Sequence, residues 1–342
     1  MAQFRRREFL IGASALLAAP FAGAARQRGK LKTIGQLNEW SAPPQDSVAA
    51  QQIRKAVFER YKSLGWVAGQ DIEFRRLFAE YDVSRLPGLA KQLVDEGVDV
   101  ISVTTTASTV AAMHATSRLP IVLAGACAYP VECGVIKSFA HPGGNVTGVA
   151  FFQGIEVQSK VAEFVRELLP SAQRLAWLAF PPDLVTFSGG QFSPKPYYLK
   201  VARDLGFDLG YYECRKVEDL DRVFAAMQAW GTQAVIVEPA ALSSLGPAQR
   251  IAQLTSQTRL PSFFNVGSNA EIGGLLSYGP SITNMYEQTA TYVSRVLRGA
   301  HPADLPVEMP NKLELVVNVK TAKALGISIP DAILVRAERV IE

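Results

Sequence analysis

Arg118-Leu119-Pro120 stands directly before the apolar run Ile121-Val122-Leu123, and the same arrangement returns as Arg259-Leu260-Pro261 before Ser262-Phe263-Phe264. In each half of the chain this stretch is the fourth strand-like segment, and a helix-patterned segment separates each strand from the next. Strands that alternate with helices of 11 to 17 residues predict right-handed βαβ crossovers and parallel sheets. The repeat therefore predicts an α/β protein with two Rossmann-like lobes.

The other strand-like segments fit this repeat. Continuous apolar runs such as Val235-Ile236-Val237 are typical of parallel sheets that are buried on both faces. Gly65, Gly97 and Gly206 stand where helices are expected to end, the usual place for a C-terminal glycine. The predicted strands cover residues 31–35, 72–77, 98–103 and 119–123 in the first half, and residues 175–178, 209–214, 233–237 and 260–264 in the second.

Two lobes also predict where a ligand lies. Without an N-terminal leader about 317 residues remain, more than a single core usually organises. In open α/β sheets the ligand lies beyond the carboxyl ends of the strands. With two such lobes, the expected site is the cleft between them.

The N-terminus has the three parts of an export signal. A basic head at residues 5–7 is followed by an apolar stretch of about a dozen residues and by small residues at 22–25. The apolar stretch is shorter than the roughly 20 residues that a transmembrane helix needs. Arg6-Arg7-x-Phe9-Leu10 resembles the twin-arginine class, whose cargo crosses the membrane folded. We therefore expect residues 1–25 to be cleaved and the mature protein, with no cysteine there to carry a lipid, to be free in the periplasm.

The charge of the chain argues against a large anionic partner. The full sequence has 35 basic and 31 acidic residues, and loss of residues 1–25 leaves 32 and 30. A chain so close to neutrality has no broad positive field for nucleic acid or anionic lipid. The expected partner is a small molecule.

Three stretches carry a family resemblance. They are His141-Pro142-Gly143-Gly144-Asn145-Val146-Thr147-Gly148, Gly273-Gly274-Leu275-Leu276-Ser277-Tyr278-Gly279, and the tail at residues 292–300, 306–308 and 315–326. They resemble the substrate-binding proteins of ABC transporters, in the group that includes tryptophan-type and tyrosine-type binding proteins. The similarity covers essentially the whole mature chain and implies the type I periplasmic binding protein fold, in which the chain crosses between the lobes three times.

Carried onto this chain, the resemblance places the crossings near residues 148–151, near Tyr278-Gly279 and near Pro306. Glycines suit such a hinge because they absorb backbone changes cheaply, although Gly143-Gly144-Asn145 can equally be a plain surface turn. The first lobe is then expected over residues 30–149 and 279–306, and the second over residues 150–278 and 307–342. The resemblance further implies a monomer that delivers its ligand to an ABC permease in the inner membrane.

Polar side chains follow the expected strands. Residues 38–41 (Asn, Glu, Trp, Ser) follow the first strand, and residues 104–108 follow the third, directly before a helix. Hydroxyls and free N–H groups at a helix N-terminus suit a carboxylate, although Thr106 or Ser108 can equally be an ordinary N-cap. In the second lobe Glu238 directly follows a buried strand, where it suits either an ammonium group or an ion pair within the protein.

Aromatic residues near the same loops offer flat apolar surface to a ligand, although any one of them alone is more typical of packing. Together with the polar residues they favour an amino acid or other small carboxylate with an apolar or aromatic part. The candidate ligand-binding residues are Trp40, Ser41, Thr105, Ser108, Tyr129, Phe187, Glu238, Asn265 and Tyr278.

Two loops depart from the family. Relatives usually have an acidic residue before the proline at position 130, where this chain has Tyr129, and Cys127 and Cys133 flank that position. An oxidising compartment permits a disulfide between these cysteines, with buried thiols as the alternative, and the Cα separation decides between them. Residues 181–196 are also unlike the family, so the ligand can differ from that of any relative.

Other functions need features that this sequence lacks. His114, His141 and His301 are the only histidines, and none has metal-ligand spacing or stands beside a nucleophile motif. Neither lobe has a G-x-G-x-x-G between its first strand and helix, so we expect no nucleotide cofactor and no enzyme. A transcription regulator would need a DNA-binding module where the export signal stands. A protein that reports its ligand to a membrane sensor stays open as an alternative to a transport component.

Overall fold

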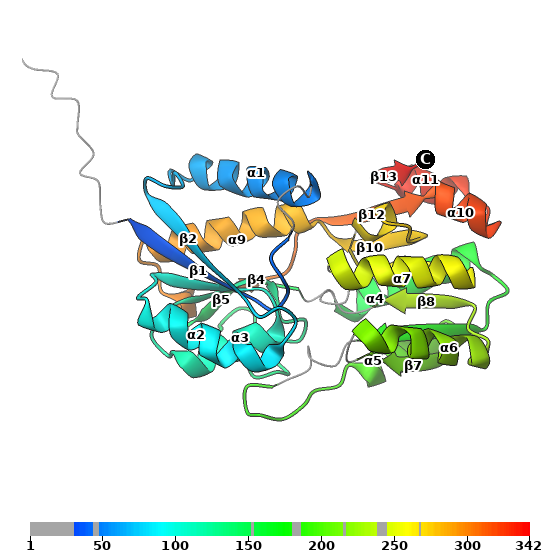
Figure 1. The fold of residues 1–342 in the computed structure, drawn as a ribbon, viewed down its shortest axis with the longest axis horizontal. Coiled ribbons are helices and arrows are strands. Elements are labelled where there is room, and N and C mark those ends of the chain that lie inside the picture. Colours follow the sequence, from blue (N-terminus) through cyan, green and yellow to red (C-terminus); the bar gives the residue numbers. More distant parts are fainter. Residues whose placement is uncertain are drawn as a thin grey trace, which may run out of the picture.

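The computed structural model describes residues 31–43, 48–151, 154–179, 186–214, 217–237, 245–266 and 268–342. Within these ranges the chain forms two α/β lobes that lie side by side (Figure 1). Each lobe has one sheet with helices packed on it, so the expectation of two lobes with largely parallel sheets is confirmed.

The described part of the first lobe has a six-stranded sheet in the order β11-β5-β4-β3-β1-β2, and every neighbouring pair is parallel. Its strands are β1 (Lys32–Asn38), β2 (Ile72–Phe78), β3 (Val100–Val103), β4 (Ile121–Ala126), β5 (Val146–Ala150) and β11 (Val307–Glu308). Its helices are α1 (Val48–Ser63), α2 (Leu86–Asp95), α3 (Thr106–Ala115) and α9 (Ile282–Leu297), with the short turns η1 (Val83–Arg85) and η4 (Pro302–Asp304).

The described part of the second lobe has a seven-stranded sheet in the order β13-β12-β10-β9-β8-β6-β7. It is parallel except between β10 and β12, where Ser277 pairs with Val316 in an antiparallel register. Its strands are β6 (Arg174–Ala179), β7 (Asp208–Glu213), β8 (Ala234–Val237), β9 (Ser262–Phe264), β10 (Leu276–Pro280), β12 (Leu313–Asn318) and β13 (Arg339–Ile341). Its helices are α4 (Gly154–Leu168), α5 (Lys195–Asp204), α6 (Leu220–Trp230), α7 (Leu245–Thr258), α8 (Ser268–Glu271), α10 (Val319–Leu325) and α11 (Asp331–Arg336), with the turn η3 (Val217–Asp219).

The central strands β3, β4 and β8 are buried along their whole length because both faces of each sheet are covered. In β3, Ile101 belongs to the core under α2 and α3, whereas its neighbour Val100 belongs to the core under α1 and α9. All four residues of β8 are buried in the same way. Gly148 of the glycine-rich motif lies in β5 at φ +117°, and a Cβ there would come within 2.6 Å of the Leu123 backbone. This residue is therefore required for the close pairing of β4 with β5.

The chain passes between the lobes after β5, after β10 and after β11. Two of the expected boundaries shift by a few residues. Strand β10 continues to Pro280 in the second sheet, beyond the boundary expected after residue 278. Val307 and Glu308 still pair with β5 of the first lobe, so the second lobe resumes after Glu308 and not at residue 307. The two residues extend the first sheet because β5 would otherwise be an open edge.

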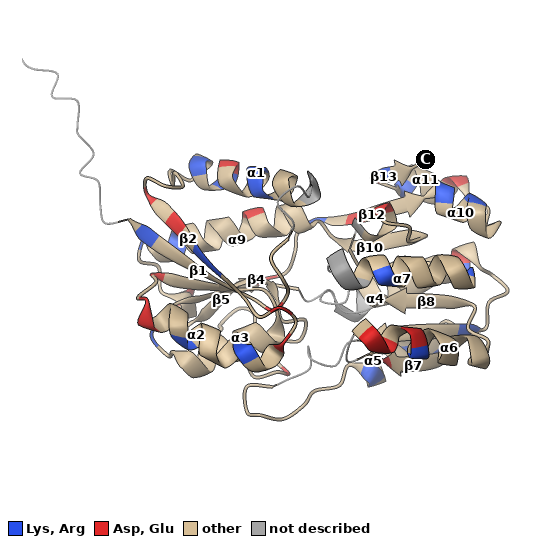
Figure 2. Cartoon of the chain, viewed as in Figure 1, with Lys and Arg blue, Asp and Glu red and all other residues tan. Residues whose placement is uncertain are grey.

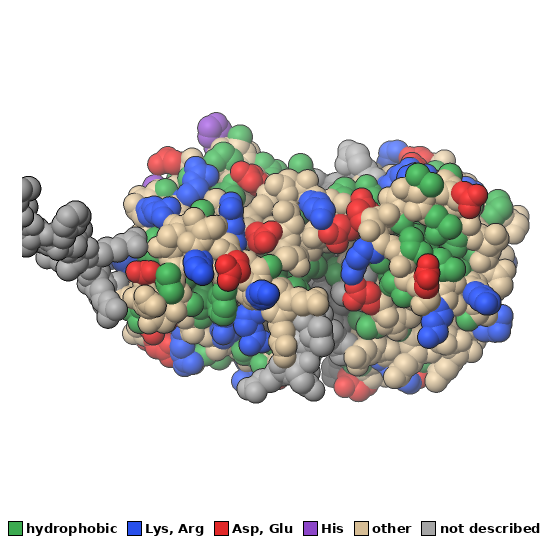
Figure 3. Space-filling model, turned by 90° about the horizontal axis from the view of Figure 1, so that it is seen from above, with side chains coloured by type: hydrophobic (Ala, Val, Ile, Leu, Met, Phe, Trp, Pro, Cys, Tyr) green, Lys and Arg blue, Asp and Glu red, His purple; other side chains and the backbone are tan. Residues whose placement is uncertain are grey.

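Charged side chains of both signs are interspersed over the outer helices of the two lobes (Figure 2). The face seen in Figure 3 likewise mixes acidic, basic and apolar side chains without a field of one sign. This distribution agrees with the weak overall charge of the sequence.

Candidate functional site

Glu39 is the first residue after β1, at the carboxyl edge of the first sheet. Its side chain is 2% exposed, and its Oε2 has no hydrogen-bond partner among the described residues. Burial raises the pKa of Glu39, and a hydrogen bond with the Thr105 side chain partly opposes this shift. A buried carboxyl group with an unused acceptor is suited to receive a donor from a ligand.

The backbone around Glu39 is held by neighbouring strands and loops. Tyr81 donates its backbone N–H to the Glu39 carbonyl at 2.8 Å. The Asn38 side chain donates to the Leu77 carbonyl at 3.2 Å, and the Thr104 hydroxyl donates to the Leu37 carbonyl at 3.3 Å. The position of Glu39 is therefore fixed by contacts with three other segments. Trp40 and Ser41 follow it and are partly exposed.

The start of α3 lies beside Glu39. Thr105 is the N-cap, and its hydroxyl accepts from the Ser108 N–H at 3.1 Å. The Ser108 hydroxyl accepts from the Thr104 and Thr105 N–H groups at 3.2 and 3.0 Å. Both side chains are buried, Thr105 at 5% and Ser108 at 0% exposure. The N-cap is therefore Thr105 and not Thr106 or Ser108 as the sequence suggested, and Ser108 completes the capping box at the third helical position. A ligand contact by the Thr105 or Ser108 hydroxyl stays a prediction.

Tyr129 lies on the loop after β4 and reaches the second lobe. Its hydroxyl lies 3.3 Å from the hydroxyl of Tyr198 in α5. Its ring centroid is 5.0 Å from that of Phe192 and 6.0 Å from that of Tyr197, with the Tyr197 ring almost parallel at 10°. The same loop contacts the start of α3, because Cys127 hydrogen bonds with the side chain of Thr106. Tyr129 therefore connects the edge that carries Glu39 with the second lobe.

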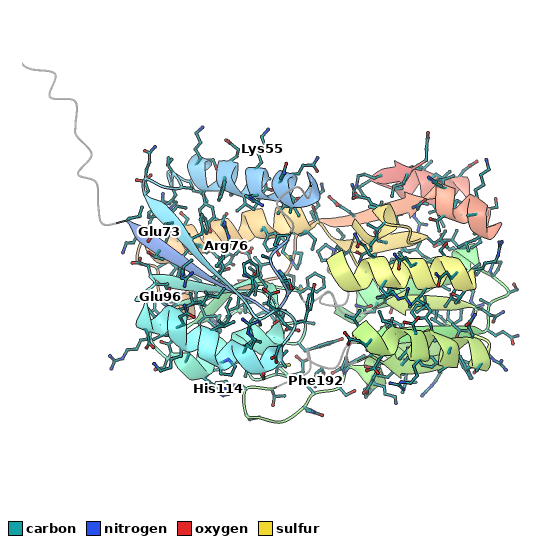
Figure 4. All side chains as sticks on the ribbon, in the orientation of Figure 1. Lys55, Glu73, Arg76, Glu96, His114 and Phe192 are labelled. Atoms are coloured by element: carbon teal, nitrogen blue, oxygen red, sulfur yellow. The ribbon has the colours of Figure 1, made fainter. Side chains whose placement is uncertain are left out.

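Phe187 lies elsewhere. Its ring is 4.8 Å from the ring of His114, and its carbonyl oxygen is 3.1 Å from His114 Nε2. His114 stands in the last turn of α3, whereas Thr105 caps the first. The structure therefore does not bring Phe187 together with Thr105 and Glu39. Figure 4 shows His114 and Phe192 along the side of the molecule where the segment before α5 passes below α3.

The second lobe contributes Asn265, which is 1% exposed at the carboxyl end of β9. The next residue, Val266, packs in a core cluster of the first lobe with Phe151 and Met285. Tyr278 in β10 packs inside the second lobe, with its ring 5.5 Å from Phe164 of α4. Asn265 thus lies at the junction of the lobes, whereas a ligand contact by the partly exposed Tyr278 stays a prediction. Glu238 lies outside the described residues.

Sequence reasoning placed Glu39 in the right loop and yet left it out of the candidate set. The signal that singled out Glu238, a carboxylate directly after a buried strand, applies equally to Glu39. Three aromatic residues of the second lobe were also missed, and a cluster of aromatic residues around a family-atypical loop was their only signal. These residues are Phe192, Tyr197 and Tyr198.

The opposite edge of the first sheet has an open pocket of about 620 Å³ between the start of β4 and β5 and the end of α9. Arg118, Asn145 and His301 are among its lining residues. It lies at the amino ends of the strands, away from Glu39. In the described ranges no group of three or more histidine, cysteine or acidic side chains is arranged to hold a metal ion. No helix of the same ranges is both long and apolar enough to span a bilayer.

Comparison with known proteins agrees with this geometry. Residues 46–341 match the family model described as ABC transporter substrate binding protein. The tyrosine-binding protein of Clostridioides difficile (strain R20291) is 23% identical over 276 residues, which cover 80% of this chain and 76% of that protein.

Two solved structures are also similar over 91% of this chain and 100% of theirs. One is a conserved domain protein from Vibrio cholerae, at a TM-score of 0.80 and 25% identity. The other is an ABC domain in complex with L-Trp from Streptococcus pneumoniae, at a TM-score of 0.79 and 24% identity. Further structural neighbours include leucine-binding and sugar-binding proteins, so the expected type I periplasmic binding protein fold is confirmed. The chain belongs to the family of ABC transporter substrate-binding proteins, which capture small molecules and are not enzymes.

Proposed function

We propose that this protein captures an amino acid with an apolar or aromatic side chain between its two lobes and delivers it to an ABC permease. The observation that carries the proposal is Glu39, whose buried Oε2 has no hydrogen-bond partner among the described residues. An ammonium group of the ligand supplies both the missing donor and the opposite charge. The relatives described as tyrosine-binding and as bound to L-Trp support this ligand class.

The rest of the ligand meets groups on both lobes. Trp40 directly follows Glu39, Tyr129 offers aromatic surface on the loop after β4, and Asn265 stands at the edge of the second lobe. Thr105, Ser108 and Ser41 are the hydroxyl groups on the first-lobe side. Glu238 joins the proposed site by its place after β8. Phe187 adds little, because its ring packs on His114 in the last turn of α3. Tyr278 joins the proposed site as a partly exposed residue of β10.

Ligand binding is coupled to hinge closure. A ligand shifts the equilibrium between open and closed lobes only by its differential affinity for the closed form. A solute with groups that reach one lobe alone should therefore bind weakly. Members of the family work outside the cytoplasmic membrane with a permease. For this chain we propose export by the twin-arginine-like leader at residues 1–25, its cleavage, and a monomer without affinity for nucleic acid.

Isothermal titration calorimetry of refolded mature protein tests the proposal. The ligands are L-tryptophan, L-tyrosine, L-phenylalanine and L-leucine, together with indole-3-propionate, which lacks the ammonium group. We expect at least one amino acid to bind and indole-3-propionate to bind at least about tenfold more weakly than L-tryptophan, because Glu39 then keeps an unused acceptor.

The variant Glu39→Gln should weaken amino acid binding by at least about tenfold, as expected for loss of a charged hydrogen-bond partner. Glu59→Gln, at an exposed position of α1, is the matched control and should leave affinity unchanged. Equal binding of L-tryptophan and indole-3-propionate, with no effect of Glu39→Gln, would overturn the proposed ligand class.

A further inference from the structure

Two buried cysteines stand in the segment after β4, and both are free thiols, so of the two alternatives raised by the sequence the structure has the unbridged one. Cys127 is 2% exposed and Cys133 is 1% exposed, and both belong to the core under α2 and α3. The two side chains share a hydrogen bond. Cys214, the third cysteine of the chain, is buried in the core of the second lobe.

The backbone between the two cysteines is folded so that they meet. Cys127 has φ +59°, a left-handed conformation that a residue with a side chain seldom adopts. The Cys133 N–H donates to the Tyr129 carbonyl at 2.9 Å, and the Val135 N–H donates to the Pro130 carbonyl at 2.8 Å. These bonds close a compact turn between the two cysteines.

The two thiols differ in acidity. Burial raises the pKa of Cys127 well above its usual value, and its hydrogen bond to Cys133 raises it further. The same hydrogen bond lowers the pKa of Cys133, with burial acting against it. Cys133 is also flanked by the exposed residues Glu132 and Gly134, whereas Cys127 is followed by partly buried ones. Cys133 is therefore the thiol that ionises first.

We propose that Cys127 and Cys133 form a reversible disulfide that fixes the loop carrying Tyr129 against the second lobe. The Cys133 thiolate attacks a small-molecule or protein disulfide and forms a mixed disulfide, with release of one thiolate from the oxidant. The Cys127 sulfur, once deprotonated, then displaces the second half of the oxidant and forms the bridge. Overall two thiols lose two protons and two electrons, and the oxidant is reduced to two thiols. This inference does not rest on the identity of the ligand.

The bridge affects contacts between the lobes because the same loop carries them. Besides the Tyr129 contacts with Phe192, Tyr197 and Tyr198, the Phe187 N–H donates to the Cys133 carbonyl at 2.8 Å. A bridge fixes both Tyr129 and this carbonyl relative to β4. The oxidised protein should therefore hold the segment from Phe187 to Phe192 more firmly than the reduced protein.

The test exposes reduced mature protein to oxidised glutathione and then alkylates it with N-ethylmaleimide in denaturant. Intact mass should show one adduct on the oxidised protein and three after treatment with dithiothreitol, since the chain has three cysteines. Peptide mapping should find residues 127 and 133 linked within one chain. The bridge closes a short loop, so we expect the melting temperature to rise by a few degrees on oxidation.

Cys214→Ala is the matched control and should keep the bridge, whereas Cys133→Ser should leave Cys127 open to alkylation. Hydrogen exchange of the Phe187 amide should be slower in the oxidised protein, because this amide donates to the Cys133 carbonyl. Three adducts after oxidation, a persistent glutathione adduct on Cys133, or a link between two chains would each overturn the proposal.

Discussion

The carbonyl group of Asn265 occupies the space in which a Cβ on Gly279 would lie. Asn265 is the first residue after β9, and Gly279 stands near the end of β10, where the chain is about to leave the second lobe. The glycine at this crossing therefore permits a close approach between two backbones. Its φ lies outside the left-handed region, so conformational freedom is not what the position requires.

Gly279→Ala should lower the free energy of unfolding by about 1–3 kcal/mol, because the new methyl group must displace the backbone of β9 or β10. Urea denaturation followed by circular dichroism measures the change. Gly144→Ala is the control, since no atom lies within 4 Å of a Cβ at that position. Equal free energies of unfolding of the two variants would show that the backbone at Asn265 can shift to accept a methyl group on residue 279 at little cost.

Ser108→Ala should cost about 1–2 kcal/mol of stability, because it removes the buried hydroxyl that accepts from two N–H groups at the start of α3. Chemical denaturation is again the measurement, with the exposed Ser117→Ala as control. A loss of ligand affinity larger than the loss of stability would indicate that Ser108 also contacts the ligand.

Glu39→Gln should stabilise the ligand-free protein at neutral pH. The pKa of Glu39 is raised in the folded state, so its contribution to stability is complete below the unfolded value near 4.5 and is lost as pH rises through the folded value. Each unit of that rise corresponds to about 1.4 kcal/mol. Denaturation curves from pH 4.5 to 8 should show that the free energy of unfolding of Glu39→Gln increases relative to that of the wild type as pH rises. A decrease of this difference with pH would contradict a raised pKa of Glu39 in the folded state.

Tyr129→Ala should loosen the segment before α5. It removes the hydroxyl contact with Tyr198 and the ring contacts with Phe192 and Tyr197. If about 1.4 kcal/mol of docking energy is lost, exchange of the Phe187 amide becomes about tenfold faster. Tyr212→Ala, whose ring contacts Trp230 within the second lobe, is the control. Unchanged exchange would mean that the segment is held by its His114 contact instead.

The repeated strand order was predictable because apolar runs and helix-ending glycines are local signals. The segments around Arg118 and Arg259 lead into β4 and β9 as expected. The antiparallel pairing of β10 with β12 was not predictable, because a strand's partner depends on residues far along the chain. For the same reason the strand pairings of Pro280 and Glu308 near the crossings were not predictable.

The candidate site was predictable only as a set of loops. Thr105, Ser108, Tyr129 and Asn265 follow strands, and the structure places them at the facing edges of the lobes. The burial of Glu39 depends on Tyr81 and Thr105, which no local pattern joins to it. Phe187 also stands in the segment after a strand, β6, and was predicted to bind ligand for that reason. In the structure it contacts His114 in the last turn of α3 instead. Strand order therefore predicts which loops matter, whereas loop length and path decide which side chains meet.

The segment from Phe187 to Phe192 belongs to the second lobe in sequence and lies against the first lobe in space. Like the packing of Val266 in the first lobe, it is a non-covalent tie beside the three covalent connections. Opening of the lobes, and with it release of a captured solute, therefore has to break aromatic contacts of the protein in addition to the contacts of the solute itself.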